Sequence, residues 1–165
     1  MMKTKSIIEI AILAALISIV GAIKIPNLIP GLEFQLSAPL AIAICVSFGF
    51  KKYIIAGCIS SLLGLLLGTQ TIVNVMIALQ FRLIVGLIIY LGQRHILSII
   101  IAGPIASTLS RISLGIFFGK LSIALVAAAV PGMIFTALMA PILSKVMVLV
   151  VKRSKSLSTT ISSLS

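Results

Sequence analysis

Apolar runs of about 20 residues recur along this chain, with no polar stretch between them long enough to form a soluble domain. Hydrophobic residues make up 61% of the 165 residues and charged residues 9%. A soluble domain is nearer about half apolar and about a quarter charged. The sequence therefore predicts an all-α integral membrane protein.

Six transmembrane helices fit the pattern, at residues 7–23, 35–50, 53–68, 70–91, 96–118 and 122–151. The connection at 24–34 (KIPNLIPGLEF) contains two prolines and a glycine that break a helix, and it is too apolar for an ordinary solvated loop. We expect it to lie on the membrane surface or to fold over a cavity. The chain then divides into a six-span membrane domain, residues 1–152, and a Ser/Thr-rich disordered tail, residues 153–165.

Lysine and arginine placement indicates the orientation, because cytoplasmic loops are enriched in both residues. With the N-terminus inside, only Lys24 and Lys120 lie on the outer side. The inner side carries eight basic residues, namely Lys3, Lys5, Lys51, Lys52, Arg94, Lys152, Arg153 and Lys155. Both termini are therefore expected in the cytoplasm. The first residues also resemble a signal peptide, but Glu9 within a rather long apolar run argues against cleavage.

The net charge of +11 would suggest a nucleic-acid partner for a soluble protein. Here the basic residues lie mostly at span ends, so they indicate orientation and contacts with anionic membrane lipid, and no nucleic-acid binding is predicted. Two cysteines and one histidine are too few for a structural zinc site, and no other metal or cofactor is expected. Glu9 and Glu33 are the only acidic residues, and neither a hydrolase motif nor a phosphate-binding loop is present. The sequence favours a binding role over catalysis.

Two arginines lie inside apolar spans, where each costs about 2.5–3.5 kcal/mol at the centre of the bilayer on insertion scales. Arg111 lies nine residues before Lys120, or about 13 Å below the outer surface at 1.5 Å per residue. Asn74 is about 6–8 Å and Arg82 about 18–20 Å below the same surface. We expect Asn74 and Arg111 to face one outward-opening pocket, with Arg82 near its floor.

Small and polar residues recur every four positions in both spans, and so share a helix face. These two stripes are Gln70, Asn74, Ala78, Arg82 and Gly86, and Gly103, Ser107, Arg111 and Gly115. Helix packing alone explains most of the small residues, and the glycine and serine stripe of residues 57–68 favours close helix contact. The arginines would need an acidic partner under that explanation, and the chain has almost none. A bound anion is the alternative.

The chain resembles the S component of an energy-coupling factor (ECF) transporter. The resemblance rests on its length, its six spans with cytoplasmic ends, and an AxxxA ridge at Ala11 and Ala15. It also rests on the proline-containing loop and on the segments GFKKYIIAG (49–57), IAGPIAS (101–107) and AAAVPGMIF (127–135). It covers roughly residues 5–150, through motifs that are individually weakly specific.

The resemblance implies capture of a vitamin or related micronutrient from outside, followed by docking on a membrane T component that carries two ATPase subunits. By position, Ala11 and Ala15 would contact the T component, and Glu33 and Gln35 would belong to a loop that caps the substrate. Embedded arginines favour a substrate with a carboxylate and disfavour a cation such as thiamin. Two other functions remain open from the sequence: a small oligomeric channel with anion preference, and a membrane assembly or scaffold protein.

Overall fold

The computed structural model describes residues 4–25, 34–35, 37–118, 126–127 and 129–162. Its helices within this part are α1 (Thr4–Ala22), α2 (Ser37–Phe48), α3 (Phe50–Leu66), α4 (Ile72–Leu91), α5 (Ile96–Phe118) and α7 (Val130–Ser162). Two short strands, β1 (Lys24–Ile25) and β2 (Phe34–Gln35), pair antiparallel, with Lys24 opposite Gln35. The expected all-helical membrane fold is confirmed, with this small hairpin added.

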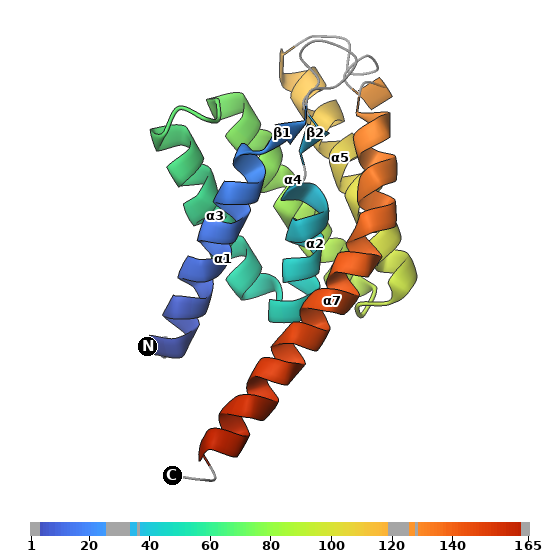
Figure 1. The fold of residues 1–165 in the computed structure, drawn as a ribbon. Coiled ribbons are helices and arrows are strands. Elements are labelled where there is room, and N and C mark those ends of the chain that lie inside the picture. The colour runs from blue at the N-terminus through green and yellow to red at the C-terminus, as the bar shows by residue number, and fades with distance from the viewer. Residues whose placement is uncertain (1–3, 26–33, 36, 119–125, 128, 163–165) are drawn as a thin grey trace.

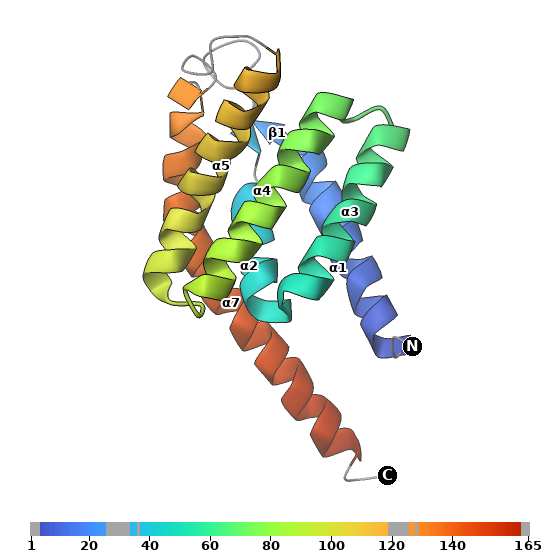
Figure 2. The same cartoon turned by 180° about the vertical axis from the view of Figure 1, so that it is seen from behind.

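Successive helices run in alternating directions, so the α2–α3 and α4–α5 turns lie at the end of the bundle where the N-terminus begins (Figure 1). We call this the terminal end, because α7 also runs past it toward the C-terminus. The β1–β2 pair and the α3–α4 turn lie at the opposite end, here called the strand end. Seen from behind, α4 lies between α3 and α5 (Figure 2).

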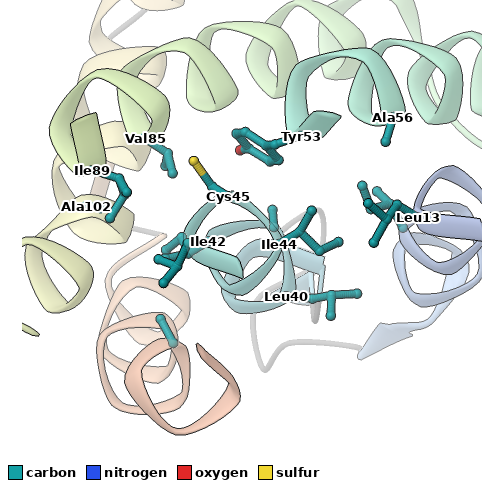
Figure 3. Close-up of a cluster of buried hydrophobic side chains, with 14 of the residues drawn as sticks. Leu13, Leu40, Ile42, Ile44, Cys45, Tyr53, Ala56, Val85, Ile89 and Ala102 are labelled. Carbon is teal, nitrogen blue, oxygen red and sulfur yellow. The ribbon is translucent and has the colours of Figure 1, made fainter. Parts of the chain in front are cut away.

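The core is built around α2, which is apolar on every side. Residues 39–46 of this helix are all buried, and α2 contacts α1, α3, α4, α5 and α7. Side chains of α1, α3, α4 and α5 close around it, among them Leu13, Tyr53, Val85 and Ala102 (Figure 3). A helix that is hydrophobic all round is stable only when neighbours cover it, which explains why α2 occupies the centre.

Among the described residues, four helices are long and apolar enough to cross a membrane: α1, α4, the Ile96–Ser113 part of α5 and the Val130–Ser154 part of α7. Helix α2 has 12 residues and α3 has 17. At 1.5 Å per residue, α2 spans about 18 Å of a hydrocarbon core about 30 Å thick. The chain is thus a helical membrane protein, while the number of full crossings stays a prediction.

The sequence-based boundaries agree with the helices to within a few residues, except in the last helix. Residues 153–162, expected in a disordered tail, continue α7 as far as Ser162. No glycine or proline follows Pro141, so nothing in the sequence stops the helix at the membrane surface.

Glycines allow the close helix contacts that the small-residue pattern predicts. A Cβ on Gly57 would lie 2.5 Å from the Arg82 side chain, and one on Gly64 would lie 2.9 Å from Gln70. A Cβ on Gly103 of α5 would lie 2.4 Å from Thr136 of α7. The packing interpretation of these glycines is confirmed.

Candidate functional site

Arg82 is buried on the face of α4 that packs against α3, with 6% of its surface exposed. Its side chain lies across Gly57, and its Nη1 donates a hydrogen bond to the Ser61 hydroxyl over 2.5 Å. Gly57 and Ser61 are one turn apart on α3. Because Gly57 has no Cβ, the Arg82 side chain can pass over it and reach the Ser61 hydroxyl. A neutral hydroxyl therefore holds the guanidinium that sequence reasoning expected to need an anion.

Gln70 faces the same neighbour. This side chain packs on Gly64 of α3 and is half-buried, and its Oε1 is buried without a hydrogen-bond partner among the described residues. Gln70 lies in the turn between α3 and α4, just before the N-cap Thr71, and not within α4 as the sequence predicted, whereas Arg82 lines the contact between the two helices. Their part in substrate binding stays a prediction.

Arg111 is half-buried on α5 and is held by its own helix. Its Nη1 donates to the Ser107 hydroxyl over 2.9 Å and lies 3.4 Å from the Ser107 carbonyl oxygen. The four-residue spacing of the two residues sets this contact, because side chains at i and i+4 lie one above the other. The structure therefore brings these two predicted site residues together, and no carboxylate among the described residues pairs with Arg111.

Asn74 lies in the first turn of α4 and is half-buried. Its backbone N–H donates to the hydroxyl of the N-cap residue Thr71 over 3.3 Å, which fixes where the helix begins. No hydrogen bond among the described residues joins Asn74 to Arg111. Residues 26–33 and 119–125 lie outside the described residues, so the expected pocket stays a prediction.

The proposed lid is described only in part. Glu33 lies outside the described residues, and so does most of loop 24–34. The backbone of Gln35 pairs with Lys24, which brings the two ends of the loop together at the strand end (Figure 1).

Ala11 and Ala15 are both exposed on α1, next to the buried face formed by Ile10, Leu13 and Ala14. The ridge is therefore not used for packing within the described part of the chain. Ser18, in step with them, is half-buried and lies 2.9 Å from the Ser60 hydroxyl of α3. This placement agrees with a surface that is free for lipid or for another membrane chain.

Sequence reasoning missed two pairings. Lys52 of α3 donates to Glu9 of α1 in an ion pair at the terminal end, with both side chains about a third exposed or less (32% and 27%). It also missed Ser61 as the partner of Arg82. Depth could have found the first pairing, because Glu9 and Lys52 fall near the inner ends of neighbouring spans.

A cavity of about 170 Å³ lies at the terminal end, opposite the expected substrate site. Residues of α2, α3, α4 and the α4–α5 turn line it, including Cys45, Phe50, Tyr90 and Arg94. Neither its position nor its lining residues match the expected substrate pocket.

No family model matches the chain. A curated relative does: 135 residues are 47% identical to Protein BioX of Lysinibacillus sphaericus, covering 82% of this chain and 81% of the relative. The chain belongs to the BioX family. Membership is consistent with the resemblance to ECF S components that the sequence motifs carry.

Proposed function

We propose that this BioX-family chain is the substrate-capture subunit of an ECF-type, ATP-driven importer in the plasma membrane of a prokaryote. Its six helices would cross the membrane with both termini in the cytoplasm. The name of the relative, BioX, supports a role related to biotin, and biotin carries the carboxylate that the embedded arginines favour. The partner would be a T component with two ATPase subunits, since the chain itself has no phosphate-binding loop.

The observation that carries the proposal is the state of Arg111. Its guanidinium is half-buried within a membrane helix and bonds only to Ser107 among the described residues, through Nη1. Arginine has five N–H donors, and its remaining donors match a planar carboxylate. Ser107 would orient the guanidinium, and Asn74 would contact the ligand from α4. Arg82, already bonded to Ser61, would stabilise the bundle beneath the site.

The test is biotin binding to the purified full chain, measured by isothermal titration calorimetry. Loss of a charge-assisted contact costs about 1.5–3 kcal/mol, so Arg111→Ala should weaken binding by about 10- to 100-fold. Arg111→Lys keeps the charge but not the bidentate geometry, so its biotin affinity should lie between that of the wild type and that of Arg111→Ala. Arg153→Ala removes the same charge from the exposed far end of α7 and should bind like the wild type.

Two outcomes contradict the proposal at different levels. Unchanged affinity in Arg111→Ala would show that the site is misplaced. A wild-type chain that binds neither biotin nor another carboxylate vitamin, and that conducts anions in a planar bilayer, would support the channel alternative instead.

A further inference from the structure

The cavity at the terminal end combines apolar walls with a cationic rim. Phe50, Ile89 and Tyr90 form much of the wall, and the buried free thiol of Cys45 also lines it. Gly49 and Gly86 also line the cavity, and the Phe50 ring occupies the place where a Cβ on Gly86 would lie. Its volume of about 170 Å³ suits a small headgroup rather than a whole lipid.

A strained turn places the polar residues of the cavity. Gln93 (φ 47°) and Arg94 (φ 61°) are consecutive non-glycine residues in the left-handed region, which L-residues adopt at a cost. Both residues line the cavity. Bonds from the Arg94 N–H to the Ile89 carbonyl and from the His95 N–H to the Gly92 carbonyl hold the turn. The backbone is thus held in a costly conformation that brings an amide and a guanidinium to one cavity.

Positive charge is concentrated at this rim without a described counter-charge. Arg94 Nη2 lies 4.0 Å from where a Cβ on Gly49 would be, so the guanidinium lies over the N-terminus of α3. Gly49 is the N-cap of that helix and no side chain caps it, so the partial positive charge of the helix end adds to that of Arg94. No hydrogen bond or ion pair to the Arg94 side chain is found among the described residues. Two positive groups in contact favour an anion between them.

The cavity also reaches the surface that faces lipid. Tyr90 lines it and is 78% exposed, and Leu87 and Leu91 on the same helix are 57% and 69% exposed. A guest whose head lies at Arg94 can therefore lay apolar chains along α4 without leaving the bilayer.

We propose that this cavity binds the phosphate headgroup of an anionic phospholipid from the leaflet at the terminal end. Arg94 and the N-terminus of α3 would hold the phosphate, Gln93 would bond to the glycerol portion, and the acyl chains would lie against α4. The proposal does not depend on what the opposite end of the protein binds.

The test is lipid retention by the full chain in detergent, measured by native mass spectrometry. The probes are dioleoyl-phosphatidylglycerol, neutral dioleoyl-phosphatidylcholine, and glycerol 1-phosphate as the free phosphate. We expect the wild type to bind phosphatidylglycerol about tenfold more tightly than either other probe, the size of one charge-assisted contact. Arg94→Gln should remove that preference. Arg94→Gly, which suits the left-handed backbone, should remove it without straining the turn.

Arg153→Gln is the matched control, since it removes an exposed positive charge beyond the terminal end without touching the cavity, and it should keep the preference. Equal loss in Arg153→Gln and Arg94→Gln would reduce the effect to general attraction of anions and overturn the proposal. Equal affinity for glycerol 1-phosphate would assign the cavity to a free phosphate. Biotin binding in the Arg94 variants should match the wild type, so failure here is distinguishable from failure of the proposed function.

Discussion

Arg82 and Arg111 are both arginines within apolar helices, yet their surroundings differ. Arg82 lies in a groove made by Gly57 and bonds across to another helix, whereas Arg111 bonds only to its own helix among the described residues. A bond between helices fixes the distance between them, and a bond within one helix only orients the side chain. This difference is the physical basis of the proposal that Arg111 binds the ligand while Arg82 holds α3 to α4.

Ser61→Ala should therefore destabilise the bundle more than the neighbouring change Ser60→Ala. Ser61 accepts from a buried charge, so its loss leaves a guanidinium unpaired at about 1.5–3 kcal/mol. Ser60 meets the neutral hydroxyl of Ser18, and a bond of that kind contributes about 0.5–1.5 kcal/mol.

Thermal unfolding with a thiol-reactive dye can compare the two variants. Cys45 is buried and Cys58 exposed, so in a Cys58→Ala background the dye reports exposure of Cys45 alone. Equal melting temperatures for the two serine variants would show that the Arg82–Ser61 bond does not hold α3 to α4.

Residue patterns in the sequence predicted the depth of Arg82 but not its partner. The cost of inserting an arginine into the membrane and its distance from the end of the span depend on one helix only. Both can therefore be predicted from the sequence. The partner depends on how α3 is rotated against α4, and in this rotation the Arg82 side chain lies across Gly57 of α3. Such a contact forms between two elements, so a pattern within either one does not determine it.

At the scale of elements, α1 is joined to α3 by a polar contact near each end. Glu9 pairs with Lys52 toward the terminal end, and Ser18 meets Ser60 toward the strand end. These contacts fix the rotation of α1 and leave Ala11 and Ala15 exposed.

Helix boundaries were largely predictable because apolar length and turn residues set them locally. The extension of α7 was not, because a Ser/Thr-rich composition says little where nothing breaks the helix.

The exposed ridge gives a prediction about partner docking. Ala15→Trp adds a large side chain to a surface that packs on nothing described, so folding and biotin binding should be unchanged. Uptake by cells that express the complete transporter should fall by about tenfold or more if a T component docks there, a loss of about 1.4 kcal/mol.

Leu83→Trp is the control for that experiment, because Leu83 is 55% exposed on α4, away from the ridge. It should leave uptake unchanged. Normal uptake in Ala15→Trp would show that the T component docks elsewhere.

At the scale of the whole molecule, charge and topology agree. Lys5 at the start of α1, Lys51 and Lys52 in α3, and Arg94 in the α4–α5 turn all lie toward the terminal end (Figure 1). Lys152 and Arg153 follow in the part of α7 that runs past it. Because basic residues favour the cytoplasmic side, this end should face the cytoplasm, with the strand end outside.

Single cysteines in the two exposed turns test this orientation, in a Cys58→Ala background where the remaining Cys45 is buried. Thr69 lies in the α3–α4 turn and His95 at the end of the α4–α5 turn, and both are exposed. A membrane-impermeant maleimide added to intact cells should label Thr69→Cys and not His95→Cys, and permeabilised cells should label both. The reverse labelling pattern would show that the orientation is inverted. Arg111 would then lie toward the cytoplasm, where it could not capture an external substrate. Labelling of both turns in intact cells would contradict the alternating crossings of α3, α4 and α5, on which the depth of every proposed site residue depends.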